Sequence, residues 1–96
     1  MISYKIEYTV KKSEINRAIG LVFEFIDGIR NNEPESIIYH AYQDSTKSAE
    51  FNHIMTFKNE HAANVHKESS YYQKFTEELF PICEKEPDYL PMILIR

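Results

Sequence analysis

Apolar and polar residues alternate strictly along the first ten positions of this chain, and this pattern constrains the fold most. Ile2, Tyr4, Ile6, Tyr8 and Val10 alternate with Ser3, Lys5, Glu7 and Thr9. Because successive side chains of a strand point to opposite faces, a repeat of two predicts a half-buried strand over residues 2–10. The fold must therefore cover one face of this strand and leave the other open.

The next segment has the spacing of an amphipathic helix. Its apolar residues are Ile15, Ala18, Ile19, Val22, Phe23, Ile26 and Ile29. We expect Ser13 to cap this helix and residues 31–34 to end it. Glu14 would then lie in its first turn, where an acidic side chain interacts favourably with the helix dipole. Four of its residues are expected to pack against the first strand. They are Ile19, Val22, Phe23 and Ile26, and their partners are Tyr4, Ile6 and Tyr8.

The rest of the chain predicts a hairpin, two helices and a last strand. Residues 36–43 and 50–57 are rich in β-branched and aromatic residues, and the turn at 44–47 joins them into a hairpin. Asn59 is expected to cap a helix over about residues 60–66. Another helix is expected to begin at Ser69 or Ser70 and to reach about Glu84, with Pro81 able to shorten it. Pro87 and Pro91 are expected to flank a turn before a strand at 92–95.

The order βαββαβ predicts an α+β fold of the ferredoxin-like type, formed by residues 1–96 as a single domain. Its usual topology is a four-stranded antiparallel sheet with the helices on one face. The open face would carry apolar groups from the hairpin and the last strand, although the first strand offers only polar ones. On balance this partly apolar face predicts a homodimer formed sheet to sheet.

Composition excludes several classes of function. The net charge is −4 and the basic residues are scattered, which argues against nucleic-acid binding. No apolar run approaches the roughly 20 residues that cross a bilayer, so no membrane association is expected. A lone cysteine, Cys83, forms no internal disulfide, and we expect a cytoplasmic protein with Cys83 as a buried apolar residue. Two glycines are too few for the glycine-rich phosphate loops of nucleotide-binding proteins.

Short motifs spread over nearly the whole chain resemble the antibiotic biosynthesis monooxygenase family, within the dimeric α/β barrel superfamily. They are Glu33-Pro34, Tyr39, the strand from Phe51 to Phe57, Glu60-x-Ala62, His66, Phe75 and Leu79-Phe80-Pro81. The resemblance implies a homodimeric α/β barrel with a pocket between sheet and helices in each subunit. It also implies oxygenation of phenols or quinols with molecular oxygen, without a metal or bound flavin, although some members degrade haem.

The sequence departs from the family pattern in the third strand. A Glu-x-Trp motif is common there, and this chain has Met55 and Phe57 at those positions and no tryptophan. The pattern of the haem-degrading branch consists of an Asn in the first strand, that Trp and a helical His. Of this set only His66 is present, which argues against haem degradation.

His53 and His66 are the candidate catalytic residues. His53 shares the apolar face of its strand with Phe51, Met55 and Phe57, so we expect it to face the helices within one ligand's reach of His66. A buried neutral imidazole could accept a phenolic proton, but it could equally be a core histidine satisfied by one partner. His66 could be a base at the pocket edge, or a residue whose positive charge stabilises the C-terminal end of its helix.

Candidate substrate-binding residues are Phe57, Tyr72, Met55 and His40. Tyr72 shares a helix face with Phe75 and Leu79, so its hydroxyl needs an interior partner, which could be a ligand. His61 is expected to be exposed. No metal site is expected, because His61 and His66 lie on different helix faces and no carboxylate is placed near His53 and His66 by spacing.

Two functions stay open on this evidence. The first is a cofactor-independent monooxygenase acting on a small phenolic or quinol-type aromatic. The second is a non-catalytic dimeric α/β barrel that binds a small ligand or serves as a stress-related module. The absent Glu-x-Trp favours the second function, and the paired histidines favour the first.

Overall fold

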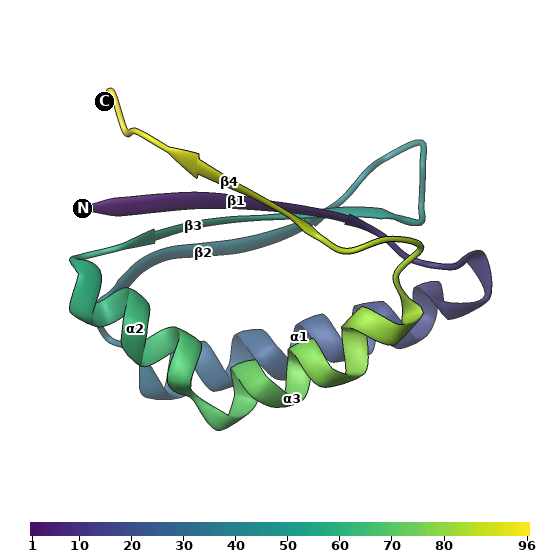
Figure 1. Ribbon diagram of the computed structural model, residues 1–96, viewed down its shortest axis with the longest axis horizontal. Coiled ribbons are helices and arrows are strands. Elements are labelled where there is room, and N and C mark those ends of the chain that lie inside the picture. Colours follow the sequence, from purple (N-terminus) through teal and green to yellow (C-terminus); the bar gives the residue numbers. More distant parts are fainter.

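The computed structural model describes residues 1–96 and has the expected ferredoxin-like α+β fold (Figure 1). Its elements are β1 (Ile2–Thr9), α1 (Ile15–Asn32), β2 (Ser36–Gln43), β3 (Glu50–Phe57), α2 (Glu60–Glu68), α3 (Ser70–Leu79) and β4 (Asp88–Met92). Short 3₁₀ turns at Lys12–Glu14 and Phe80–Ile82 precede α1 and follow α3. None of the helices combines the length and the apolar composition that a membrane crossing requires.

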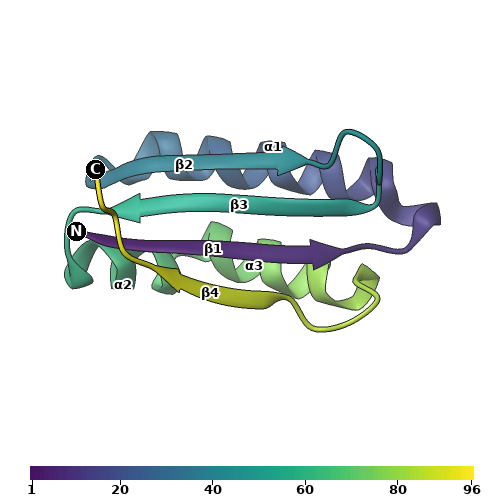
Figure 2. The ribbon, with the colours of Figure 1, turned by 90° about the horizontal axis from the view of Figure 1, so that it is seen from above.

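The four strands form one antiparallel sheet in the order β2-β3-β1-β4, and all three helices cover the same face (Figures 1 and 2). The alternation of β1 and β3 sets which residues face the helices. Ile6 of β1 lies opposite His53 of β3 and Tyr89 of β4 in the register, so these three residues share the covered face. The candidate residues of β3 therefore point toward the helical layer.

Two side-chain caps fix where α2 and α3 begin. The Asn59 side chain accepts a hydrogen bond from the backbone N–H of Ala62 at 2.9 Å, and the Ser69 hydroxyl accepts one from Tyr72 at 3.1 Å. Both caps agree with the sequence expectation. The expected Ser13 cap is wrong, because a 3₁₀ turn occupies Lys12–Glu14 and no side chain caps α1. The α1 N-terminus is instead continuous with that turn.

The buried stripe of α1 differs from the expected one. Its buried residues are Ala18, Leu21, Phe25 and Ile29, whereas Ile19, Val22 and Ile26 pack at the edge of the core and Phe23 is 70% exposed. At 3.6 residues per turn, Phe23 lies about 140° around the helix from Ala18, outside the covered face. Apolar residues occupy so wide an arc of α1 that spacing alone did not locate its centre.

The C-terminal part also differs from expectation. The last strand is Asp88–Met92, so Pro91 lies within it opposite Tyr4, and Ile93–Ile95 follow it as exposed residues. An edge strand tolerates proline, because a missing N–H on its outer side removes no ladder bond. The helix expected to reach Glu84 ends at Leu79, where Pro81 falls in a 3₁₀ turn. Cys83 is buried, as expected.

The placement of the core predicts opposite outcomes for two phenylalanines of α1. Phe25 is buried, and its ring stacks on Phe75 with centroids 4.3 Å apart. Phe25→Ala should reduce the free energy of unfolding by about 3–5 kcal/mol, because it removes a fully packed ring. Phe23→Ala should change it by less than about 1 kcal/mol. Urea denaturation of both variants tests this, and equal losses would contradict the orientation of α1.

Candidate functional site

A layer of aromatic side chains fills the space between the sheet and the helices, and both candidate histidines lie in it. His53 and His66 are 1% and 2% exposed. The Phe25 ring lies near both, at centroid distances of 6.5 Å from His53 and 5.5 Å from His66. The Tyr39 ring is 5.6 Å from His53 and 5.4 Å from His66. The structure thus brings the two histidines into one layer, with His53 facing the helices as alternation predicted.

His53 has a partner at each ring nitrogen. Its Nε2 lies 2.8 Å from the Tyr8 hydroxyl and its Nδ1 lies 2.9 Å from the Tyr39 hydroxyl. Burial, and secondarily the charge of His66, lowers the pKa of His53 from 6.5 to about 4, so the ring is neutral at pH 7. A neutral imidazole has one donor and one acceptor, so one tyrosine donates to His53 and the other accepts from it.

Both tyrosines keep their protons in this network, because burial raises the pKa of the Tyr8 and Tyr39 hydroxyls far above the usual range. His53 therefore has no free nitrogen for a substrate in this conformation. Its arrangement is that of a satisfied core histidine, and its catalytic role stays a prediction.

His66 is held on one side only. Its Nδ1 lies 3.1 and 3.2 Å from the two carboxylate oxygens of Glu33, and its Nε2 is buried without a partner. Because an ionised carboxylate only accepts hydrogen bonds, Nδ1 carries the proton. In the neutral ring the lone pair is then on Nε2, among the rings of Phe57 and Tyr72, each 5.1 Å away. A buried, unpartnered acceptor is the least explained polar atom of the interior.

Glu33 is a residue of the candidate site that spacing did not locate. It follows α1, is 7% exposed, and accepts hydrogen bonds from Ser36 at 2.7 Å, from Tyr71 and from His66. Burial alone would raise the pKa of Glu33, but these three donors together lower it, so the carboxylate is ionised. Spacing along the sequence placed no carboxylate near the histidines, and the fold brings Glu33 to His66. Only the resemblance had singled out Glu33, through the Glu33-Pro34 pair.

The structure brings three of the four candidate substrate-binding residues to this layer. Met55 and Phe57 are buried on the covered face of β3, and the Tyr72 hydroxyl bonds to that of Tyr89 at 2.7 Å. His40 is not among them, because it is exposed on the open face of β2 beside Tyr42. Tyr39 and His40 must point to opposite faces, and Tyr39 takes the covered one. His61 is exposed, as expected.

The interior has little free space in this conformation. A cavity of about 20 Å³ lies within the layer, lined by residues that include Tyr8, Tyr39, His53, Tyr72 and Tyr89. This volume holds roughly one water molecule, so the expected ligand-sized pocket is filled by aromatic side chains. Any aromatic ligand must displace some of them.

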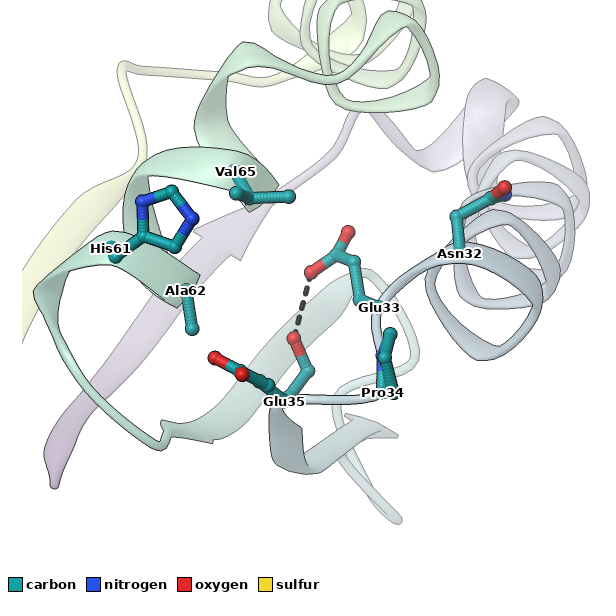
Figure 3. Close-up of a pocket in the computed structure, with 8 residues that line it drawn as sticks. Asn32, Glu33, Pro34, Glu35, His61, Ala62 and Val65 are labelled. Atoms are coloured by element: carbon teal, nitrogen blue, oxygen red, sulfur yellow. Dashed lines mark hydrogen bonds between the residues drawn. The ribbon is translucent and has the colours of Figure 1, made fainter.

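A larger pocket of about 170 Å³ lies on the outer side of Glu33. It is open to solvent, and residues 32–36 line it together with His61, Ala62 and Val65. Figure 3 shows the Glu33 carboxylate directed toward the space between Ala62 and Val65. Glu33 thus lines this pocket, which His66 does not, and its carboxylate is bonded to His66. No group of three or more His, Cys, Asp or Glu side chains is arranged to hold a metal ion.

The burial of His53 predicts a loss of stability in mild acid. The unfolded chain takes up a proton at a pKa near 6.5 and the folded chain only near 4, so stability should fall as the pH drops between these values. At 1.36 kcal/mol per pKa unit the loss approaches about 3 kcal/mol. Urea denaturation from pH 7 to pH 4 should show this slope, and a flatter slope is expected in His53→Gln. Equal slopes in the two proteins would contradict a neutral, buried His53.

Comparison with known proteins agrees with the fold. A crystal structure of an antibiotic biosynthesis monooxygenase matches at a TM-score of 0.92 and 16% identity, with 100% of both chains covered. A candidate member from Nitrosomonas europaea gives 0.92, 15% identity and the same coverage. A protein from Mycobacterium tuberculosis gives 0.89 and 12% identity, over 99% of this chain and 95% of that one. These identities show the fold alone.

No curated protein matches the chain. The model of the antibiotic biosynthesis monooxygenase family, however, matches residues 1–78, which is most of the sequence. This agrees with the resemblance carried by the Glu33-Pro34 pair and His66. The chain belongs to the antibiotic biosynthesis monooxygenase family.

Proposed function

We propose that this protein is a monooxygenase that oxidises a small phenolic or quinol-type aromatic without a bound cofactor, with His66 as the base. The observation that carries this proposal is the Nε2 atom of His66, which is buried and unpartnered while Glu33 holds Nδ1. The function of a general base requires a free lone pair within hydrogen-bond reach of the substrate proton. Among the two candidate histidines, only His66 has one.

The chemistry follows from the substrate. Transfer of the ring O–H proton to Nε2 leaves an electron-rich oxyanion, which can itself give electrons to molecular oxygen. One oxygen atom then bonds to the ring and the other leaves as water, so that a phenol and O₂ give a quinone and water, and the substrate supplies all the electrons. Glu33 stabilises the imidazolium that forms, because its ionised carboxylate faces Nδ1–H. The surrounding aromatic rings keep water from the oxyanion and its oxygenated product. This division of roles needs no group beyond the side chains of the layer.

Substrate entry requires the aromatic layer to open. The hydroxyls of Tyr72 in α3 and Tyr89 in β4 form a solvent-exposed hydrogen bond, and both residues line the small cavity. Because β4 is an edge strand paired only with β1, separating Tyr89 from Tyr72 breaks no ladder bond. We propose that the substrate enters there and lies between Phe57, Met55 and Tyr72. His53 would then act only through Tyr39, by orienting its hydroxyl.

The alternative is a non-catalytic barrel that binds a small ligand or serves as a stress-related module. The closed interior favours it, because a cavity of about 20 Å³ does not admit an aromatic ring. Met55 and Phe57 at the positions of the family's Glu-x-Trp motif favour it as well. Turnover, rather than binding, separates the two functions.

Oxygen consumption with a panel of quinols and phenols tests the proposal. We expect the wild-type protein to consume oxygen with at least one of them, and His66→Ala to reduce kcat by about 10²–10⁴-fold, the usual contribution of a general base. His61→Ala is the matched control, because it changes an exposed histidine of the same helix and should leave kcat unchanged. Substrate binding without oxygen consumption would establish the alternative.

We also propose a homodimer formed through the open face of the sheet. This face carries Ile38, Ile54, Leu90 and Met92, of which Ile38, Leu90 and Met92 are 39%, 40% and 36% exposed. Burial of such side chains against a second copy would remove an apolar surface from water.

Sedimentation at micromolar concentration tests the dimer. The wild-type protein should sediment as a dimer, and Ile54→Lys, which places a charge on the open face, should shift it to monomer. Phe23→Lys is the control, because Phe23 is exposed on α1, away from the sheet face. A monomeric wild-type protein would refute the proposed assembly.

A further inference from the structure

Tyr71 reaches the carboxylate that holds His66. It lies in the first turn of α3, is partly buried, and donates a hydrogen bond to Oε2 of Glu33. The other oxygen, Oε1, accepts from the Ser36 hydroxyl at 2.7 Å. With one neutral donor on each oxygen, the carboxylate presents both oxygens to Nδ1 of His66 at nearly equal distances of 3.1 and 3.2 Å.

The absence of a side chain at Gly28 leaves room for Tyr71 to reach Glu33. A Cβ at position 28 would lie 2.6 Å from Cγ and 2.9 Å from Cβ of Tyr71, which is closer than atoms approach in proteins. These atoms are at the root of the side chain, so Tyr71 could move away only by shifting α3. Glycine within a helix is less favourable than alanine, and Gly28 lies within α1. The close passage of Tyr71 explains why glycine is required there.

The other glycine of α1 has no such contact. A Cβ at Gly20 would meet nothing within 4 Å. The two glycines belong to the same helix and differ in what lies over them, so they form a matched pair for substitution. Gly20→Ala should raise the helix propensity of α1 without touching the site.

Tyr71 is suited to act as a permanent donor. Burial, followed by its bond to Glu33, raises the pKa of its hydroxyl to about 12, so it stays protonated at neutral pH. Without this donor, Glu33 would keep only Ser36 and His66, and its carboxylate, which borders the open pocket (Figure 3), could rotate away from His66. Nδ1 would then lose its fixed acceptor, and the proton could move to Nε2.

We infer that Tyr71, admitted by Gly28, is a positioning residue that holds Glu33 against Nδ1 and so keeps the lone pair of His66 on Nε2. The catalytic meaning of this inference rests on the proposed role of His66 as the base. Tyr71 itself touches no reacting atom in this arrangement. It acts through Glu33, and its removal should change the tautomer of His66 rather than the fold.

Nitrogen-15 NMR of the imidazole rings in the ligand-free protein tests the inference, since the chemical shifts of Nδ1 and Nε2 report which nitrogen carries the proton. In the wild-type protein we expect His66 to be protonated at Nδ1, with at most a few per cent of the other tautomer. Tyr71→Phe and Gly28→Ala should each raise the Nε2–H fraction at least tenfold. Gly20→Ala should leave the His66 shifts unchanged.

The inference is overturned if Tyr71→Phe leaves the His66 shifts as they are in the wild type, or if wild-type His66 carries its proton on Nε2. Should Gly28→Ala fail to fold, Tyr71→Phe decides alone, because it removes one oxygen and adds no volume. These spectra need no substrate. A tautomer shift together with an absence of quinol oxidation would uphold the positioning role and refute the proposed function; oxidation without a tautomer shift would do the reverse.

Discussion

Phe25 organises the interior on which the other features depend. Its ring stacks on Phe75 and lies within 6.5 Å, centroid to centroid, of five further rings. These belong to Tyr39, His53, His66, Tyr71 and Tyr72. Because they come from β2, β3, α2 and α3, a single side chain of α1 joins the sheet to all the helices that cover it. Close packing of this kind leaves little volume, which explains why the cavity within the layer is so small.

The same layer gives its two histidines opposite characters. His53 has tyrosine hydroxyls at both nitrogens, and burial keeps it neutral. His66 has a carboxylate at one nitrogen and only rings around the other. A polar atom that is buried without a partner destabilises the folded state by roughly 1–3 kcal/mol. Such an atom in an otherwise satisfied interior is the kind of local imperfection that functional sites retain.

A closed aromatic layer and the proposed catalytic base are compatible if the layer opens at its edge. The weakest side is the one closed by β4, which is short, exposed and paired on one side only. Elements with few buried contacts open at low free energy, whereas the Phe25 cluster does not. Opening at β4 would therefore expose the layer while leaving Glu33, on the far side of His66, in place. Access for the substrate and orientation of the base would then be controlled by different elements.

The sequence by itself determined the class of fold, the helix-facing side of β1 and β3, and the cap Asn59, and it left the start of α3 between Ser69 and Ser70. These features are encoded by periodicity and local hydrogen bonds, which need only neighbouring residues. It did not determine the buried stripe of α1, because apolar residues such as Phe23 extend over too wide an arc. The face of His40 was also open, since nothing local fixes which side of β2 is covered.

Only the tertiary structure decided the composition of the site. Glu33 and His66 are 33 positions apart, and their contact depends on where the end of α1 lies relative to α2 on the covered face of the sheet. The same holds for Gly28 and Tyr71, whose close approach follows from the packing of α1 on α3. Spacing along one element cannot reveal such pairs, because the distance between them is set by the packing of several elements. The sequence therefore identified two histidines, and the fold showed that both nitrogens of His53 are hydrogen-bonded whereas Nε2 of His66 is not.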